Sequence, residues 1–469
     1  MLAAAIFVAL SRSESLLCGV HSVYPLIGER TVPTKGSDSG IDPHRFPRST
    51  ELSPNTAVGL SPVKASNGET HCPYRRATDL LQRLAPGKMR IGFFVGAGCP
   101  LAIQIPDGES TKPLIPEIAG LTKQVKEALG KDPDLKDIAQ QAWNRVIGRD
   151  ISDPTVEDIL SHIRTLKSLC VEKGNIDGFS RELLVKLDLA ICDKVRDIVS
   201  QRLPASDTPY HVLASWIQAI PREKPVEIFT TNYDLLLEQA LEDQRVPYFD
   251  GFVGSDSAFL DLESMSEDDL PARWARLWKV HGSINWWMTK EDKIRRSRDK
   301  VEGEQLLIYP SHLKYDQSRQ MPYYAMLDRL REFLRSDQCV LVTCGYSFAD
   351  QHINAYIEQG LSGNPNAACI AMIFNDRGNA PLAVELAKRH ANLTLLAADG
   401  GIIGTVDREW STDVKEQDPA HSVAVATDLP DWRTKAPKDR CKWLLGDFKA
   451  FGSFLAYQLS SRNVEQGSL

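Results

Sequence analysis

The stretch Met89-Arg90-Ile91-Gly92-Phe93-Phe94-Val95-Gly96-Ala97-Gly98 predicts the centre of the fold. Apart from Arg90, residues 89–95 form a continuous apolar run, which is typical of a strand buried on both faces of a parallel sheet. The run ends abruptly at a Gly-Ala-Gly turn. The sequence therefore predicts a central strand followed by a tight loop.

The glycine turn has two interpretations. Glycines at a strand end let the backbone approach a phosphate, whose charge is met by amide groups and a helix N-terminus. A tight turn without a ligand would have the same sequence. Leu101 stands where the dinucleotide fingerprint has its third glycine, so the turn is not an ordinary dehydrogenase motif.

Strand and helix patterns alternate after residue 226. The predicted strands cover residues 226–230, 277–280, 305–309, 340–344, 369–374 and 393–396. The predicted helices between them cover residues 235–243, 322–335, 350–361 and 381–390. Alternation with helical crossovers indicates a mostly parallel, doubly wound sheet, which is a Rossmann-like α/β fold.

A helical subdomain is predicted between the first strand and this alternation, at about residues 113–220. Apolar residues recur at helical spacing in the segments 114–129, 135–147, 155–170, 179–203 and 208–220. Asp153-Pro154-Thr155 and Asp207-Thr208-Pro209 supply helix start signals. We expect this insertion and the sheet to border a cleft.

The two ends of the chain differ from its middle. Residues 1–75 are expected to be a poorly ordered leader, because most of them are rich in Ser, Pro, Gly, Thr and Arg and lack periodicity. Residues 76–400 form the predicted nucleotide-binding domain, opening with a short helix from Thr78 or Asp79. Residues 401–469 form a C-terminal extension with a helix expected at 441–459. Its apolar stripe, Leu444, Phe448, Phe451 and Leu455, would pack back on the domain or contact a partner.

Composition limits the class of protein. The 469 residues are 42% apolar and 25% charged, as in a soluble globular protein. A net charge of −7 argues against general nucleic-acid binding, although residues 293–298 form a short basic strip or a solvated loop. The nine cysteines include no CxxC, which indicates reduced thiols and a cytoplasmic protein. No apolar run approaches the ~20 residues of a membrane span.

Thr230-Thr231-Asn232-Tyr233-Asp234 follows a predicted strand and opens a helix. Open α/β sheets bind ligands at such strand ends. A buried amide there needs hydrogen-bond partners, which favours a functional role for Asn232. Asp234 either contributes to the site or caps the following helix, and both roles are compatible.

His281 ends the strand 277–280 and precedes a glycine. An imidazole titrates near neutrality, so it can accept a proton from a sugar hydroxyl. His312 and His352 are interpreted as structural or exposed. Trp286 and Trp287 either wall the pocket or pack in the core.

Together these segments resemble the sirtuins. Ile105-Pro106-Asp107 follows Gly98 at the spacing of the sirtuin cofactor loop, and Gly345-Tyr346-Ser347-Phe348 matches the family's G-T-S-L in part. The chain departs from the family pattern at Pro100, Gln104 and Gly108-Glu109, where sirtuins have Ser, Gly and Phe-Arg. In the sirtuins that phenylalanine helps to shield the reacting face of the sugar from water. Its absence here therefore favours hydrolysis by water over transfer to another acceptor.

The resemblance implies residue roles. Asn232 would bind the nicotinamide ribose and the attacking water, Asp234 the carboxamide, and His281 would be the base. The remaining implied contacts to NAD⁺ would come from Gly96, Ala97, Gly98, Asp107, Thr231, Gly345, Ser347 and Asn375.

Deacylating sirtuins carry a four-cysteine zinc ribbon after the His-Gly pair, but residues 282–338 contain no cysteine. We therefore expect no metal site. The pattern resembles the sirtuin-like NAD⁺ hydrolases of bacterial antiphage defence, which implies gated NAD⁺ depletion, a homo-oligomer, and a HerA-like ATPase, Argonaute-type or phage-protein partner. Alternatives are a non-catalytic NAD⁺ or ADP-ribose sensor, and a protein deacylase or ADP-ribosyltransferase.

Overall fold

The computed structural model describes residues 70–87, 89–147, 153–171, 174–266, 270–291, 293–307, 322–411, 419–427 and 441–466. The chain divides into the units Met1–Lys64 and Ala65–Leu469, and the described residues all belong to the second unit.

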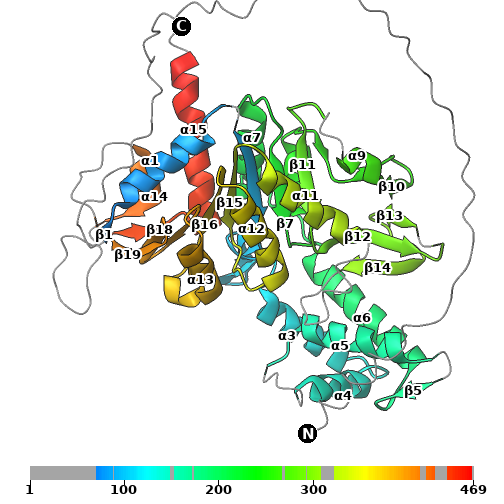
Figure 1. The fold of residues 1–469 in the computed structure, drawn as a ribbon. Coiled ribbons are helices and arrows are strands. Elements are labelled where there is room, and N and C mark those ends of the chain that lie inside the picture. Colours follow the sequence, from blue (N-terminus) through cyan, green and yellow to red (C-terminus); the bar gives the residue numbers. More distant parts are fainter. Residues whose placement is uncertain are drawn as a thin grey trace, which may run out of the picture. The chain divides into compact units, whose positions relative to one another are not determined.

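A ten-stranded sheet organises this unit (Figure 1). Its central six strands run in the order β11-β7-β2-β15-β16-β17, and every neighbouring pair among them is parallel. In chain order this is the 3-2-1-4-5-6 arrangement of doubly wound nucleotide-binding folds. The six strands are β2 (Arg90–Val95), β7 (Glu227–Thr230), β11 (Ala275–Lys279), β15 (Cys339–Cys344), β16 (Ala367–Met372) and β17 (Leu393–Ala397). The predicted Rossmann-like α/β fold is confirmed.

Four further strands extend the two edges of this sheet. β8 (Tyr248–Phe249) adds to β11 in parallel. On the other side β18 (Gly400–Ile403) and β19 (Val406–Trp410) turn back antiparallel, and β1 (Thr70–His71) pairs with β19. Residues 70–75, which were expected to belong to the leader, therefore form β1 and the start of a helix.

The apolar run of β2 serves two cores. Phe93 and Val95 face one hydrophobic cluster and Phe94 faces the other, because successive side chains of a strand point to opposite faces. Helices cover both faces, which explains why the strand is apolar throughout rather than alternating.

Different helices cover each face of the sheet. The helices α11 (Tyr323–Arg335), α12 (Gln351–Gly363) and α13 (Pro381–Arg389) pack on the Phe94 face (Figure 1). The opposite face carries α1 (Pro73–Leu84), α7 (Pro209–Ala219), α14 (Pro419–Ala424) and α15 (Phe448–Gln466). α8 (Leu236–Asp243) follows β7. The prediction that the first helix opens at Thr78 or Asp79 is wrong, because Pro73 occupies the first turn with the backbone angle that a helix needs.

The C-terminal helix begins later than the expected residue 441, since β21 (Lys442–Trp443) pairs there with β20 (Val425–Ala426). α15 packs against α7, and Phe448 and Phe451 are buried. Of the two roles considered for its apolar stripe, the described contacts are those of packing back on the domain.

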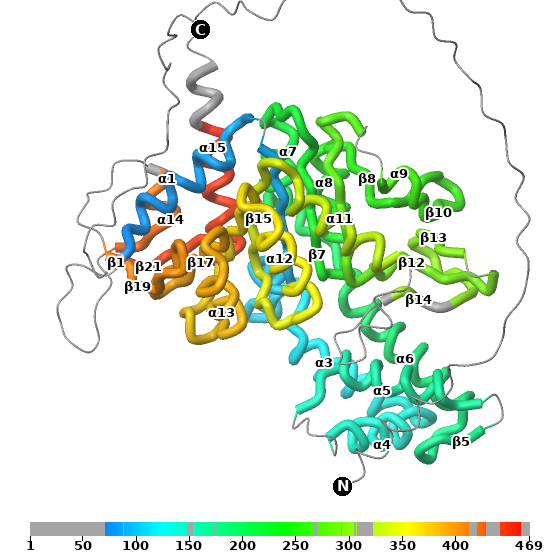
Figure 2. Tube along the Cα trace, viewed as in Figure 1, coloured from blue at the N-terminus to red at the C-terminus, as the bar shows by residue number. Residues whose placement is uncertain are grey.

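Of the five helices predicted between about residues 113 and 220, four form a group that we call the helical insertion: α3 (Ile118–Gly130), α4 (Lys136–Ile147), α5 (Val156–Leu169) and α6 (Arg181–Val199). The fifth is α7, which packs against α15 and α8 instead. Figure 2 shows the four helices of the insertion grouped together, with the short hairpin of β5 (Asn175–Ile176) and β6 (Phe179–Ser180) beside them. Thr155 begins α5 with a reciprocal capping box to Asp158, and Thr208 begins α7 in the same way with His211. Both starts lie at predicted start signals.

A five-stranded antiparallel sheet follows the parallel strands in the order β14-β12-β13-β10-β9. Its strands are β9 (Phe252–Val253), β10 (Ala258–Leu260), β12 (Gly282–Thr289), β13 (Ile294–Arg296) and β14 (Gly303–Leu307), and α9 (Leu262–Ser266) follows β10. The strand predicted at residues 305–309 was assigned to the parallel sheet, which is wrong. Its described part is β14, which pairs with β12; residues 308 and 309 lie outside the described residues.

The five-stranded sheet also contains two motifs whose role the sequence left open, the Trp286-Trp287 pair and the basic strip at residues 293–298. Trp286 and Trp287 on β12 are both buried; Trp286 packs on Phe252 in the core, and the indole N–H of Trp287 donates to the Ser297 carbonyl. They are core residues. Within the basic strip, Arg296 forms an ion pair with Asp250, and Arg295 donates to the Ser257 carbonyl. These two arginines are engaged within the protein.

Candidate functional site

The sheet changes winding direction between β2 and β15, and ligands of doubly wound folds bind at the carboxyl ends of such a strand pair. Two glycine turns meet there. The Gly96 amide donates to the Cys344 carbonyl at 2.9 Å, and the Gly98 amide donates to the Gly345 carbonyl at 2.9 Å. Segments almost 250 residues apart in the sequence are thereby held together.

Glycine is required because the two turns approach so closely. A Cβ atom on Gly96 would lie 2.3 Å from the Gly345 carbonyl oxygen, and one on Gly98 would lie 2.8 Å from the Gly345 Cα. Gly345 itself has a φ of +64°, in the left-handed region. The amides of Gly96 and Gly98 are bonded within the protein, so what this loop offers a ligand is the close approach of its backbone.

Asn232 is anchored to the neighbouring strand. Its side-chain amide donates to the Gly96 carbonyl at 3.1 Å, and its backbone amide donates to the Thr230 hydroxyl oxygen at 3.0 Å. That hydroxyl in turn donates to the Val95 carbonyl at 2.7 Å. The sequence analysis expected the side-chain amide of Asn232 to need a hydrogen-bond partner. That partner is the Gly96 carbonyl at the end of β2.

Asp234 caps the helix after β7, and its position is compatible with the site role that the sequence left open. Its carboxylate accepts the backbone N–H of Leu236 at 3.0 Å at the start of α8, and it also lines the cleft described below. Burial raises the pKa of Asp234, while the nearby Lys279 ammonium opposes the shift. The Lys279 ammonium also donates to the backbone carbonyl oxygen of Asp234 and to the carboxylate of Glu238. These two hydrogen bonds fix the turn between β7 and α8.

His281 lies between β11 and β12, at the point where the chain leaves the parallel sheet. Gly282 has a φ of +83°, and a Cβ there would lie 2.3 Å from the Leu306 carbonyl oxygen, so the His-Gly pair needs its glycine. The Nε2 atom of His281 lies 3.0 Å from a carboxylate oxygen of Asp350. His281 is buried, with its side chain 10% exposed.

A single large cleft brings most of the predicted residues together. Its volume is about 1460 Å³, and it is lined by both glycine turns, the ends of β7 and β11, the helical insertion and the start of α15. Predicted residues among its lining are Ala97, Gly98, Thr231, Asn232, Asp234, His281, Gly345, Ser347 and Asn375.

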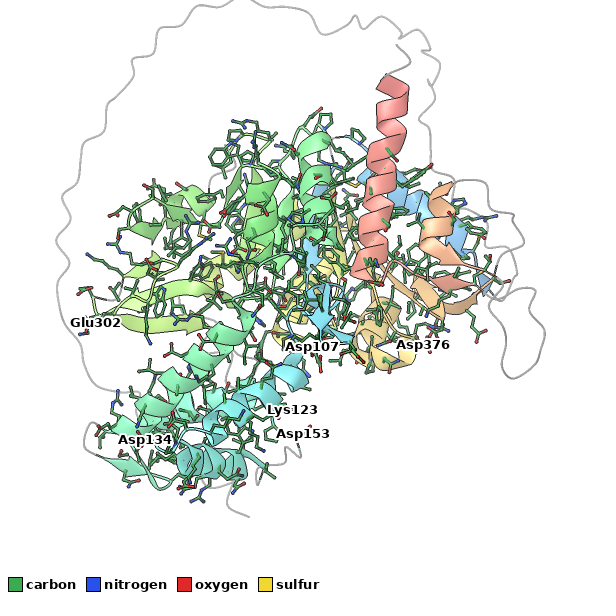
Figure 3. All side chains as sticks on the ribbon, turned by 180° about the vertical axis from the view of Figure 1, so that it is seen from behind. Asp107, Lys123, Asp134, Asp153, Glu302 and Asp376 are labelled. Atoms are coloured by element: carbon green, nitrogen blue, oxygen red, sulfur yellow. The ribbon has the colours of Figure 1, made fainter. Side chains whose placement is uncertain are left out.

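Two predicted site residues do not join this lining. Gly96 lies behind it, bonded to β15 and Asn232. Asp107, labelled in Figure 3, belongs to the hairpin of β3 (Gln104–Asp107) and β4 (Ser110–Pro113). Its exposed carboxylate pairs with Lys112 at 3.1 Å rather than facing the cleft. His352, interpreted from the sequence as structural or exposed, is part of the lining; His312 lies outside the described residues.

Several lining residues were missed by sequence reasoning. Glu157 comes from the helical insertion, and its carboxylate accepts a hydrogen bond from the Tyr233 hydroxyl at 3.2 Å. Burial raises the pKa of Tyr233 well above its ordinary value, and the charge of Glu157 adds to the shift. Lys449 comes from α15. Neither residue stands in a motif, so the sequence carried no local signal for them.

Asp350 was also missed, although it lies only two residues after the Gly345-Tyr346-Ser347-Phe348 segment that the sequence analysis singled out. The available signal was an Asp at the start of the predicted helix 350–361, which indicates a cap rather than a partner for His281.

Acidic side chains outnumber basic ones in the cleft. Among the described residues that line it, Lys449 is the sole Lys or Arg, whereas the carboxylates are Glu117, Glu157, Asp158, Asp207, Asp234, Asp350 and Asp447. A diphosphate bound here would have few cationic partners and would depend on backbone groups.

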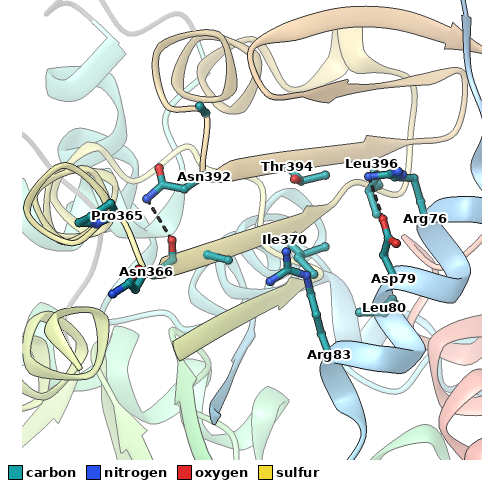
Figure 4. Close-up of a pocket in the computed structure, with 13 residues that line it drawn as sticks. Arg76, Asp79, Leu80, Arg83, Pro365, Asn366, Ile370, Asn392, Thr394 and Leu396 are labelled. Atoms are coloured by element: carbon teal, nitrogen blue, oxygen red, sulfur yellow. Dashed lines mark hydrogen bonds and ion pairs between the residues drawn. The ribbon is translucent and has the colours of Figure 1, made fainter. Parts of the chain in front are cut away.

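A second, smaller cavity of about 240 Å³ lies between α1 and the strands β16 and β17 (Figure 4). Arg76, Asp79 and Arg83 of α1 line it together with Asn366 and Asn392. Arg76 and Asp79 form an ion pair at 2.9 Å. None of the predicted site residues reaches this cavity.

In the described part of the chain, no group of three or more His, Cys, Asp or Glu side chains is placed to hold a metal ion. The eight cysteines of that part are free thiols. Burial raises the pKa of Cys99, beside Gly98, well above its ordinary value, and the neighbouring Cys344 adds to the shift.

None of the described helices combines the length and the apolar character needed to traverse a bilayer.

Comparison with known proteins identifies one family model, described as a SIR2-like domain, which matches residues 226–396. This range contains Asn232, His281 and Gly345 but not the glycine turn after β2. No curated protein matches the chain.

Two solved structures are similar to parts of the chain. One, titled "Structural Basis for the Mechanism and Regulation of Sir2 Enzymes", is 12% identical, covers 66% of this chain and 89% of its own, and has a TM-score of 0.31. The other, titled "Crystal structure of a Sir2 homolog-NAD complex", is 14% identical, covers 68% and 87%, and has a TM-score of 0.31.

Proposed function

We propose that this protein is an NAD⁺ hydrolase that releases nicotinamide and ADP-ribose. The observation that carries the proposal is that Asn232, Asp234, His281 and the glycine turns, scattered over 250 residues of sequence, line one cleft at the switch point of the sheet. Its volume of about 1460 Å³ exceeds the ~300–1,000 Å³ typical of small-ligand pockets, so a dinucleotide fits. The SIR2-like match and the sequence resemblance support NAD⁺ as the ligand.

The chemistry requires little acid catalysis. Cleavage of the bond between nicotinamide and ribose passes through an oxocarbenium-like centre, as in other glycosyl transfers. Nicotinamide leaves as a neutral amine, so it needs no strong general acid. Water attacks the sugar carbon, and the proton that it releases passes to a base, for which we propose His281.

The proposed residue roles follow from position. Asn232, held by Gly96, orients the ribose and the attacking water, and Asp234 beside it holds the carboxamide. His281 acts as a base near the ribose hydroxyls. Such positioned acid–base help is worth ~10²–10⁴-fold in rate. Ala97, Gly98, Gly345 and Ser347 would contact the diphosphate and adenosine half.

The test is incubation of the purified full chain with NAD⁺, with and without candidate partners, followed by separation of nicotinamide and ADP-ribose by chromatography. We expect Asn232→Ala and His281→Ala to abolish nicotinamide release. Asn144→Ala is the matched control, because Asn144 is exposed on α4 and lies outside the cleft lining. NAD⁺ binding without turnover under all of these conditions would favour a sensor, and ADP-ribose attached to protein would favour a transferase; either result contradicts hydrolysis.

We further propose a biological role in antiphage defence, in which hydrolysis depletes NAD⁺ in the cytoplasm after a trigger. This proposal rests on the sequence resemblance alone. It includes a homo-oligomer and a partner such as a HerA-like ATPase, an Argonaute-type protein or a phage protein. Turnover measured with and without each candidate partner tests it, and activity that no partner changes would contradict the gating.

A further inference from the structure

The two carboxylate oxygens of Asp350 have different bonding partners. Asp350 stands directly before α12, and its Oδ1 accepts the backbone N–H groups of His352 at 3.0 Å and Ile353 at 3.4 Å. Its Oδ2 lies 3.0 Å from the Nε2 atom of His281. The Asp350 side chain is 8% exposed, so the contact with His281 is made away from bulk water.

The loop that presents Asp350 is fixed from both sides. Phe348 has a φ of +58°, which is uncommon for a bulky residue and persists only where surrounding contacts impose it. Asn354 supplies such a contact, because its side-chain amide donates to the Phe348 carbonyl at 2.7 Å. The Tyr346 hydroxyl donates to the Asn354 side-chain oxygen at 3.0 Å. The position of the carboxylate is therefore determined by packing before any ligand binds.

Capping alone does not require an aspartate here. Serine, threonine and asparagine cap helices as well as aspartate does. In this chain Thr155, Ser180 and Thr208 begin α5, α6 and α7 with a single hydroxyl oxygen. The contact with His281 uses a second oxygen, which only a carboxylate provides.

An ionised carboxylate only accepts hydrogen bonds, so the His281 Nε2 atom must carry the proton of this bond. A neutral imidazole has one N–H, and the basic lone pair is then on Nδ1. When Nδ1 accepts a proton, the adjacent carboxylate stabilises the resulting imidazolium.

We infer that Asp350 is the positioning residue for His281. It selects the Nε2–H tautomer and stabilises the cation formed when a proton moves from a hydroxyl oxygen to Nδ1; the Nε2 proton stays on the imidazole. The use of this proton transfer rests on the proposed hydrolysis of NAD⁺, whereas the tautomer does not.

The test variant is Asp350→Asn. Its side-chain oxygen retains the helix cap, but an NH₂ donor replaces the acceptor facing His281, which forces the opposite tautomer. We expect kcat for nicotinamide release to fall by ~10²–10⁴-fold. The Kd of ADP-ribose and the thermal midpoint should stay near the wild-type values. In ¹⁵N NMR of histidine-labelled full-length protein, the His281 proton should be on Nε2 in the wild type and on Nδ1 in the variant, with His281→Gln used to assign the signal.

Asp261→Asn is the matched control. Asp261 also accepts a backbone N–H at the start of a helix, from Glu263 at 3.2 Å, and it does not line the cleft. It should change neither kcat nor the His281 signal. If Asp350→Asn does not fold, Asp350→Ser provides the second variant, because a serine caps the helix and offers no carboxylate to His281.

Unchanged kcat in Asp350→Asn, or an unchanged His281 tautomer, would overturn the inference. The NMR result does not depend on turnover. If wild-type protein releases no nicotinamide with any candidate partner present, the proposed hydrolysis fails, and the tautomer still decides whether Asp350 positions His281.

Discussion

Two buried aspartates, Asp188 and Asp234, have pKa values shifted in opposite directions. Burial raises the pKa of Asp234, and Lys279 only partly opposes it. Burial also acts to raise the pKa of Asp188, but the Arg164 guanidinium at 3.1 Å and the Lys167 ammonium outweigh it, so the net pKa is lowered. The partners therefore decide the charge state of each residue. Asp188 is a structural anion that joins α5 to α6, whereas Asp234 is a carboxylate that retains a proton more readily.

Replacing Asp188 with asparagine should destabilise the protein by about 3 kcal/mol at pH 7, because Arg164 and Lys167 lose their buried partner. The lowered pKa means that this stabilisation is complete above the unfolded-state pKa of about 3.9 and is lost as pH falls through the folded-state value. Urea unfolding at several pH values should therefore show wild type and variant converging only in strong acid.

The matched control is Asp134→Asn, at a residue labelled in Figure 3, whose exposed carboxylate lies 3.5 Å from Lys186. Exposed pairs contribute about 0–1 kcal/mol. Equal losses for the two variants, or a difference independent of pH, would contradict the role assigned to Asp188.

At the scale of elements, α12 packs against α11 and approaches it very closely at Gly360. A Cβ atom on Gly360 would lie 2.5 Å from the Cβ of Leu334, which is fully buried. Because that atom is close to the backbone, a rotamer change cannot relieve the clash. The closeness of the two helices matters for the site, since α12 begins directly after Asp350.

Gly360→Ala should lower the free energy of unfolding by up to about 2 kcal/mol. Overpacking costs about 1–3 kcal/mol, and the gain in helix propensity of about 1 kcal/mol recovers only part of it. Gly363→Ala on the same helix is the control, since no atom lies within 4 Å of its Cβ position, and it should be neutral or slightly stabilising. Thermal midpoints measure both. A stabilised Gly360→Ala protein would show that α12 can move away from α11 at no cost.

At the scale of the whole described unit, the cleft draws its walls from the sheet, the helical insertion and α15. The hydrogen bond between Glu157 and Tyr233 joins the insertion to the end of β7. Gly452 of α15 approaches Pro209 of α7 so closely that a Cβ there would lie 3.0 Å from the proline side chain. The cleft therefore joins three parts of the chain that are far apart in sequence.

Binding of ADP-ribose should slow hydrogen exchange in three segments together: residues 97–104, 155–160 and 446–456. Ligand binding to the native state raises the free energy of opening wherever the bound contacts are lost on opening. Mass spectrometry of peptides with and without ADP-ribose measures this effect. The smaller cavity at α1, with Arg83 and Asn366, is the internal control and should not change. Protection confined to one of the three segments would contradict a shared cleft.

The sequence by itself determined the fold class and most of the motif positions. A buried strand without alternation requires cover on both faces, and the run 89–95 met that condition in β2. The glycine turns were predictable because close backbone approach tolerates no side chain, and Asn232 was predictable because a buried amide needs a partner. These are local requirements, so they can be read from local patterns.

Only the tertiary structure decided which segments meet. Residues 305–309 have a strand pattern, but pairing with β12 placed their described part in an antiparallel sheet. Asp107 fits the spacing of the cofactor loop, yet the β3–β4 hairpin directs it to Lys112. The sequence indicates only a helix cap at Asp350, and its second carboxylate oxygen contacts His281 because the end of β11 and the start of α12 lie close together. Long-range pairing and side-chain direction depend on the packing of the whole unit, which no single stretch of sequence encodes.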